Sequence, residues 1–201
     1  MTLRYLALGD SYTIGEGVAP AGRWPVQLAR NLREAGIALD APRILATTGW
    51  TTGELAAAMD AQRFEPPYDL VSLLIGVNDQ YRGYPADDYR GAFRRLLVRA
   101  IDLAGGHPGH VLVLSIPDWG VTPFARHENR EPARISSELD AYNAIARAEA
   151  RRRGAHWVDI TPISRQFPEL LADDGLHPSA AQYARWAEAA QDCVRRALSS
   201  P

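Results

Sequence analysis

The sequence predicts an α/β fold in which one parallel β-sheet is covered by helices on both faces. Five apolar runs of strand length alternate with segments in which apolar residues recur at helical spacing. This alternation is typical of parallel sheets, because a helix must return the chain to the starting edge before each new strand. The run 69–76 is almost entirely apolar, as expected of a central strand buried on both faces.

Length and composition predict one domain, residues 1–201. Of the 201 residues, 46% are hydrophobic, which is enough for a full core. The net charge is only −2 and both signs are mixed along the chain, so we expect no attraction for nucleic acid or anionic lipid. There is no apolar leader at the start of the sequence and no apolar run of membrane-spanning length. These features predict a soluble, cytoplasmic protein without membrane insertion.

Two absences in the composition exclude classes of chemistry. All basic residues are arginine, so a Schiff-base lysine, a pyridoxal enzyme and a P-loop are excluded. Cys193 is the only cysteine, which excludes an internal disulfide and a multi-thiolate metal site. We therefore expect no cofactor and no metal, and no effect of chelators on activity.

The first third of the chain contains two predicted strands with a helix between them. An apolar run over 3–8 breaks off into Gly9-Asp10-Ser11, and a loop is predicted after Ser11. A helix is predicted over 24–35, with Gly36 as its C-terminal stop. The run 43–46 is a weaker strand candidate.

The middle of the chain predicts a helix, the central strand and a longer helix. The pattern Thr51-x-x-Glu54 is a capping box that opens a helix. After the strand 69–76 we expect a loop containing Asp79, Tyr81, Arg82 and Tyr84. Apolar residues at helical spacing then mark a long amphipathic helix, namely Tyr89, Phe93, Leu96, Leu97, Ala100 and Ile101.

The last part of the chain predicts two more strands and two more helices. A strand over 110–116 leads into a loop from 117 to about 134, and a helix follows that ends at Gly154. The fifth strand is predicted at 156–160. An apolar stripe marks the final helix, with Tyr183, Ala187, Ala190, Val194 and Ala197 on one side.

Polar residues gather where these strands end, which is the edge at which parallel α/β sheets place their chemistry. Ser11 follows the first strand and Gly49 the second, Asn78 follows the third, and Asp174 with His177 comes after the fifth. They offer a hydroxyl, two donors to an oxyanion, a carboxylate and an imidazole. These groups suit acyl transfer by a serine nucleophile.

Each of these residues also has an ordinary structural interpretation. Asp10 and Ser11 are typical caps of a following turn, and Asn78 is typical of an Asx-turn. Gly49 is the residue that a turn with positive φ requires. Asp174 is a common turn carboxylate, and His177 precedes Pro178 as a helix N-cap does.

The motifs together resemble those of the SGNH, or GDSL-type, hydrolases. GDSY at 9–12, an isolated Gly49 ahead of a helix, GVND at 76–79 and DGLHP at 174–178 stand in the order of that family's four sequence blocks. Tyr12 replaces the leucine that often follows GDS. The resemblance implies a flavodoxin-like three-layer α/β/α sandwich with a five-stranded parallel sheet.

The resemblance also implies roles for the matching residues. Ser11 would be the nucleophile, His177 the base and Asp174 the carboxylate that orients it. The N–H groups of Ser11 and Gly49, with the Asn78 amide, would form the oxyanion hole. The implied function is a serine hydrolase that cleaves carboxylic esters through an acyl-enzyme, with a small-molecule ester as its partner.

Residues in the strand-end loops are candidates for substrate binding. These are Tyr12, Trp50, Tyr81, Arg82 and Trp119, with Phe124 as a further candidate. Bulky aromatics beside the oxyanion donors favour acetyl or other short acyl groups, and Arg82 would suit a polar leaving group. The alternatives are a lysophospholipase- or thioesterase-like activity on longer chains, a non-catalytic ligand-binding module such as a flavin carrier, and a metal-dependent hydrolase. The sequence leaves the oligomeric state open.

Overall fold

A parallel sheet of five strands forms the centre of the protein, as predicted. The computed structural model describes residues 2–128 and 130–199. The strand order is β2-β1-β3-β4-β5, and all neighbouring pairs are parallel. The strands are β1 (Tyr5–Gly9), β2 (Arg43–Ala46), β3 (Leu70–Leu74), β4 (Val111–Leu114) and β5 (His156–Val158).

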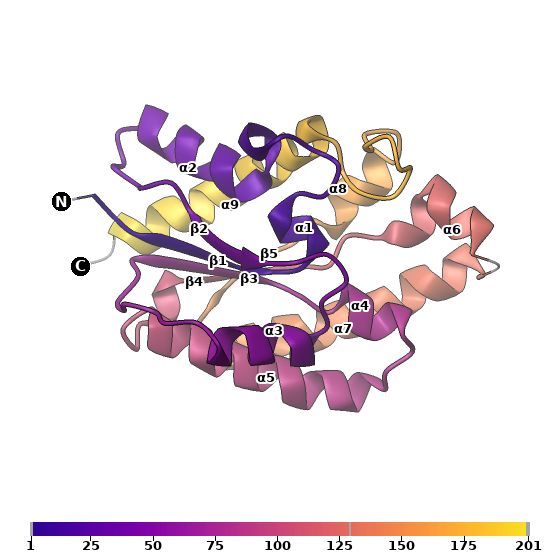
Figure 1. Ribbon diagram of the computed structural model, residues 1–201, viewed down its shortest axis with the longest axis horizontal. Coiled ribbons are helices and arrows are strands. Elements are labelled where there is room, and N and C mark those ends of the chain that lie inside the picture. The colour runs from indigo at the N-terminus through magenta and orange to yellow at the C-terminus, as the bar shows by residue number, and fades with distance from the viewer. Residues whose placement is uncertain (1, 129, 200–201) are drawn as a thin grey trace.

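Helices cover both faces of this sheet, which gives three layers (Figure 1). On one face lie α2 (Trp24–Glu34) and α9 (Ala180–Ser199), and on the other α3 (Thr52–Asp60), α5 (Ala86–Leu103) and α7 (Pro132–Arg153). The order 2-1-3-4-5 is that of the flavodoxin-like sandwich, so the predicted fold class is confirmed. In this order the direction of winding reverses between β1 and β3, where such folds bind ligands.

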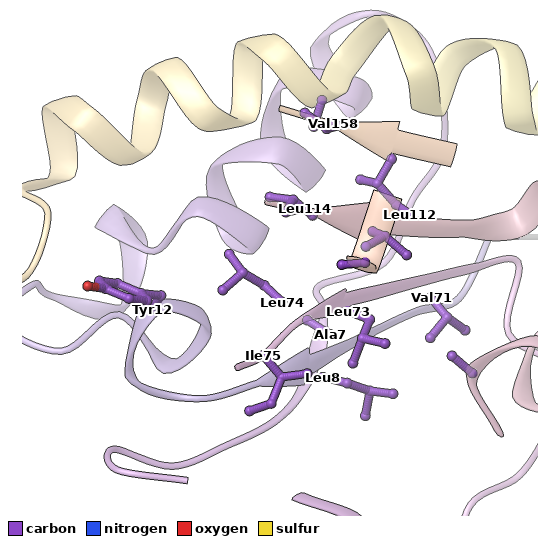
Figure 2. Packing of buried hydrophobic residues seen from close by; sticks show 14 of the residues in the cluster. Ala7, Leu8, Tyr12, Val71, Leu73, Leu74, Ile75, Leu112, Leu114 and Val158 are labelled. Carbon is purple, nitrogen blue, oxygen red and sulfur yellow. The ribbon is translucent and has the colours of Figure 1, made fainter. Parts of the chain in front are cut away.

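The core is made by the central strands and the helix faces pressed against them (Figure 2). All five residues of β3 are buried, which confirms the prediction of a strand covered on both faces. Leu8 and Leu73, neighbours across β1 and β3, are both 0% exposed. Burial of one such leucine contributes about 1.5–3 kcal/mol, so these strands form a rigid support for the residues at their carboxyl ends.

Short helices occupy segments for which the sequence predicted no helix. They are α1 (Ser11–Ile14), α4 (Val77–Tyr81), α6 (Pro123–His127) and α8 (Thr161–Gln166), with 3₁₀ turns η1 (Pro20–Gly22), η2 (Pro108–His110) and η3 (Trp119–Val121). Helices of four to six residues are unstable alone and carry no readable apolar period, because caps and tertiary contacts hold them. The loops predicted after Ser11, around Asp79 and over 117–134 are therefore corrected to partly helical segments.

The remaining helix predictions agree closely with the structure. The capping box is present: Thr51 N donates to Glu54 Oε2 at 2.8 Å and Glu54 N donates to Thr51 Oγ1 at 3.3 Å. Gly154 ends α7 with φ of +78°. Within residues 2–128 and 130–199, no helix has both the length and the apolar character needed to cross a membrane.

Candidate active site

Ser11 is the first residue of α1, directly beyond the end of β1. Asp10 caps this helix, and its Oδ1 accepts a hydrogen bond from Tyr12 N at 3.0 Å. A Cβ on Gly9 would lie 2.5 Å from the carbonyl oxygen of Leu74, so only glycine lets the chain turn so close to β3. The predicted capping role of Asp10 is thus present, and this cap holds Ser11 at the strand end.

His177 and Asp174 form a closed hydrogen-bonded turn before α9. Asp174 Oδ1 accepts the backbone N–H groups of Leu176 and His177, both at 2.9 Å, and Oδ2 lies 2.6 Å from His177 Nδ1. Burial opposes ionisation of Asp174, but the hydrogen bonds from His177 and the two backbone N–H groups outweigh it and lower the pKa of the carboxyl. An ionised carboxylate can only accept, so Nδ1 carries a proton, and it is Nε2 that has the lone pair in the neutral imidazole.

Gly49 follows β2 and Asn78 follows β3, so both lie at the edge of the sheet where Ser11 follows β1. Gly49 has φ of +85°, and a Cβ built there would meet no atom within 4 Å, so its backbone borders open space. Asn78 Nδ2 donates to the carbonyl of Trp50 at 2.8 Å, which uses one of its two hydrogens and leaves the second available. Because Trp50 follows Gly49 in the chain, this hydrogen bond connects the two segments that carry the potential oxyanion donors.

Asp79 in α4 and Arg82, which caps the C-terminus of α4, make further hydrogen bonds to the segment after Gly49. Asp79 is 1% exposed and accepts Thr52 N at 2.9 Å and Thr52 Oγ1 at 2.5 Å. Burial raises the pKa of Asp79, and the hydrogen bonds from Thr52 oppose that shift. Arg82 Nη2 donates to the Gly49 carbonyl at 2.7 Å. The segment 49–52 is therefore held by consecutive turns of α4.

One cavity of about 200 Å³ brings most of the predicted site residues together. Its walls contain both polar strand-end groups and aromatic rings, and they are formed by Ser11, Tyr12, Thr48, Gly49, Val77, Asn78, Tyr81, Trp119, Phe124, Leu176 and His177. Ser11 and His177 both line this cavity. Within the described part of the chain, no hydrogen bond joins their side chains. Catalytic hydrogen bonds often become short only when substrate binds.

Two of the predicted substrate-binding residues do not line this cavity. Arg82 contacts the Gly49 carbonyl and, at 3.3 Å, Glu54. Trp50 packs partly buried against the core, and its carbonyl accepts a hydrogen bond from Asn78. Both residues contact the segment that carries the possible oxyanion donors, and their substrate contacts stay predictions.

The sequence did not indicate that a hydrogen-bonded chain holds the aromatic wall. Trp119 Nε1 donates to Gln80 Oε1 at 2.9 Å, and Gln80 Nε2 donates to Glu138 at 2.8 Å. Tyr81 packs edge-on against Trp119 with ring centroids 5.6 Å apart. Gln80 directly follows the GVND block, but a lone glutamine carries no signal that would have identified it.

The carboxyl of Asp10, next to Ser11 in the chain, has a strongly raised pKa. It is 0% exposed, and its Oδ2 has no hydrogen-bond partner among the described residues. Burial raises the pKa of Asp10 to about 8, with the nearby Asp79 charge adding to the shift. Within the described chain, no three His, Cys, Asp or Glu side chains gather where they could hold a metal ion.

The raised pKa of Asp10 predicts that the free energy of unfolding falls as the pH rises towards about 8. The folded protein binds more protons than the unfolded one above pH 3.8, so its stability falls by about 1.4 kcal/mol per pH unit up to the folded pKa. Asp10→Asn keeps the capping oxygen and removes this titration. Urea unfolding at pH 6 and pH 9 should show wild type losing stability relative to Asp10→Asn; parallel changes in both proteins would contradict the assignment.

The fold is an α/β sandwich in which a serine stands at the end of the first strand. The model of the GDSL-like lipase/acylhydrolase family matches residues 7–185, and the chain belongs to that family. It is thus a GDSL-family hydrolase with an esterase/acylhydrolase fold. Comparison with curated protein sequences gives no match.

Solved structures of similar fold cover nearly the whole chain. TesA is 20% identical with a TM-score of 0.76, covering 98% of this chain and 100% of its own. The psychrotrophic esterase EstA from Pseudoalteromonas sp. is 17% identical with a TM-score of 0.73, covering 98% and 99%. An acetyl xylan esterase from Geobacillus stearothermophilus is 20% identical with a TM-score of 0.67, covering 99% and 97%. At these identities the likeness concerns the fold alone.

Proposed function

We propose that this protein is a serine hydrolase that cleaves esters of acetyl and other short acyl groups. The observation that carries the proposal is the shared cavity, where Ser11, Gly49 and Asn78 meet a histidine already bound to a carboxylate. Tyr12, Tyr81 and Trp119 are proposed to bind the substrate, with Phe124 at the same wall. The reaction requires no cofactor.

The reaction begins with attack of Ser11 Oγ on the ester carbonyl carbon. His177 Nε2 accepts the hydroxyl proton as the new C–O bond forms, and Asp174 stabilises the resulting imidazolium. The carbonyl oxygen becomes an oxyanion, which accepts hydrogen bonds from the N–H groups of Ser11 and Gly49 and from the free Asn78 hydrogen. Collapse of this intermediate breaks the bond to the alcohol, which leaves with the proton from His177.

The second half of the reaction repeats these steps with water. His177 takes a proton from a water molecule, whose oxygen attacks the acyl-enzyme carbonyl. The same donors bind the second oxyanion. When this intermediate collapses, the bond to Ser11 Oγ breaks, His177 returns its proton to that oxygen, and the acid is released.

Asn78→Ala should lower kcat by about 100- to 1,000-fold, because one oxyanion donor is lost. KM should change little, since the oxyanion exists only in the transition state. Asn78→Asp is the isosteric companion: it lacks the donor and adds a negative charge beside the oxyanion, so its loss should be at least as large. Steady-state kinetics on one acyl ester measure both constants. A raised KM with normal kcat would instead assign Asn78 to substrate binding.

The short-acyl proposal rests on the small volume of the cavity, about 200 Å³, and on its aromatic walls. Tyr12 and Trp119 are only 3% and 2% exposed and bound it as packed rings. Methylenes gain about 0.8 kcal/mol each only where they are buried. We expect kcat/KM along an acyl series with one leaving group to peak at four carbons or fewer. Efficiency that keeps rising beyond butanoyl would favour a thioesterase- or lysophospholipase-like role.

A further inference from the structure

Two of the proposed oxyanion donors, the N–H of Gly49 and the side-chain amide of Asn78, come from different segments of the chain. Both must lie about 3 Å from the same oxygen, so their mutual position matters as much as their presence. A Cβ on Gly49 would meet no atom within 4 Å, and none of the described residues accepts a hydrogen bond from its N–H. The position of Gly49 therefore depends on hydrogen bonds to its carbonyl and to its neighbours in the chain.

Arg82 is hydrogen-bonded to both of these residues. Its backbone N–H donates to the Asn78 carbonyl at 3.0 Å, and its Nη2 donates to the Gly49 carbonyl at 2.7 Å. Asn78 Nδ2 donates in turn to the carbonyl of Trp50, the residue after Gly49, at 2.8 Å. These hydrogen bonds close a ring through the four residues, and the ring fixes where Gly49 lies relative to Asn78.

Glu54 holds the guanidinium of Arg82 in place. Its Oε2 lies 3.3 Å from Arg82 Nη2 and also accepts hydrogen bonds from Thr51 N at 2.8 Å and Thr51 Oγ1 at 2.9 Å. The capping box of α3 thus fixes the carboxylate that contacts Arg82. The side chains of Arg82 and Glu54 are 41% and 45% exposed, so their ion pair contributes little to the stability of the fold.

We propose that Arg82 is a positioning residue for the oxyanion hole, which holds the Gly49 N–H at a fixed place relative to the Asn78 amide. The proposal rests on the proposed ester hydrolysis at Ser11. Arg82 does not line the cavity that Ser11, Gly49 and Asn78 share, so it acts through the Gly49 carbonyl. The oxyanion needs these donors more than the ground-state ester does, so loss of the Arg82 guanidinium should affect kcat and leave KM nearly unchanged.

The test measures kcat and KM for p-nitrophenyl acetate in Arg82→Met and Arg82→Lys. Arg82→Met removes the side-chain donor to Gly49 and should lower kcat by about 10- to 100-fold, as expected when a group at the reacting centre is displaced by about 1 Å. Arg82→Lys keeps a donor for the Gly49 carbonyl and should recover part of this loss. In both variants KM should stay within about twofold of the wild-type value.

Arg99→Met is the matched control. Arg99 also donates to a backbone carbonyl, that of Ala56 in α3 at 3.1 Å, and also pairs with a carboxylate, that of Asp60 at 2.8 Å. It does not line the cavity. We expect Arg99→Met to keep the wild-type kcat, and thermal unfolding should show a similarly small change in Tm for both methionine variants. A fall in kcat in Arg82→Met alone is then specific to its contact with Gly49.

A double-mutant cycle with Gly49→Ala separates positioning from a direct effect of the Arg82 charge. Alanine disfavours the φ of +85° at this position, so Gly49→Ala displaces the donor and should lower kcat by about 100- to 1,000-fold. Because Arg82 acts through Gly49, adding Arg82→Met to Gly49→Ala should change kcat by less than about threefold. A guanidinium charge that stabilised the oxyanion directly would give the same loss in either background.

A wild-type kcat in Arg82→Met, or a lysine variant as slow as the methionine variant, would overturn the proposal. So would a loss that persists undiminished in the Gly49→Ala background. A raised KM with normal kcat would also overturn it, and would support the substrate contact of Arg82 that the sequence predicts. Failure of the proposed function is distinct, because the wild type would then not turn over the ester, or Ser11→Ala would turn it over equally well.

Discussion

Ser11→Ala should reduce kcat for ester hydrolysis by about 10⁴-fold or more. The substitution removes the only group in the proposed mechanism that forms a bond to the substrate. The oxyanion donors and the cavity remain, so a small residual rate and near-normal substrate binding are expected. The fold should be unaffected, because the Ser11 hydroxyl has no hydrogen-bond partner in the described chain and alanine is favourable in the first turn of α1.

Two measurements make this test decisive. An alkyl phosphonate ester should add covalently to Ser11 in wild type, detected by the mass of the labelled peptide, and should not label Ser11→Ala. Ser72→Ala is the matched control, since it removes a buried hydroxyl bonded to Tyr5 at 2.9 Å within the same sheet and should cost stability without loss of turnover. Wild-type turnover by pure Ser11→Ala would refute the mechanism.

Asp174→Asn should reduce kcat by about 10³- to 10⁴-fold at neutral pH. The Asp174 carboxylate accepts three hydrogen bonds: Oδ1 accepts two from backbone N–H groups, and Oδ2 accepts one from His177 Nδ1. An asparagine that keeps its oxygen on the backbone N–H groups must direct its NH₂ at Nδ1. Nδ1 then has to accept, the proton moves to Nε2, and His177 loses the lone pair that deprotonates Ser11.

The neighbouring carboxylate offers the control for this substitution. Asp173 is exposed and precedes the turn, so Asp173→Asn makes the same chemical change without touching His177. We expect it to retain wild-type kcat. Thermal unfolding should show Asp174→Asn still folded, since the backbone N–H groups keep their acceptor. Equal activity of Asp174→Asn and wild type would remove Asp174 from the mechanism.

The positions of the polar site residues could be predicted because topology alone brings them together. Ser11, Gly49 and Asn78 each follow a strand of one parallel sheet, and the carboxyl ends of such strands share an edge. The sheet topology alone therefore places three of the four sequence blocks, those of Ser11, Gly49 and Asn78, at this edge. The fourth, which carries His177, returns to this edge through the turn that Asp174 closes.

Apolar members of the cavity could not be found in this way. Leu176 and Val77 border the cavity, yet in sequence they look like any core residue. In the sequence, Leu176 stands within DGLHP only as a residue between Asp174 and His177. It lines the cavity together with Trp119, which belongs to a segment far away in the chain.

The sequence by itself determined the sheet, its covering helices and the residues at the strand ends, because apolar periodicity and glycine breaks are local signals. Which way the loop residues face was decided by the tertiary structure. Segment 77–81 is a helix, so Asn78 and Tyr81, three residues apart, share the cavity face, while Asp79 and Arg82 turn towards Thr52 and Gly49. A helix of five residues leaves no period to read, and its contacts with Thr52 in α3 and Glu138 in α7 set that direction.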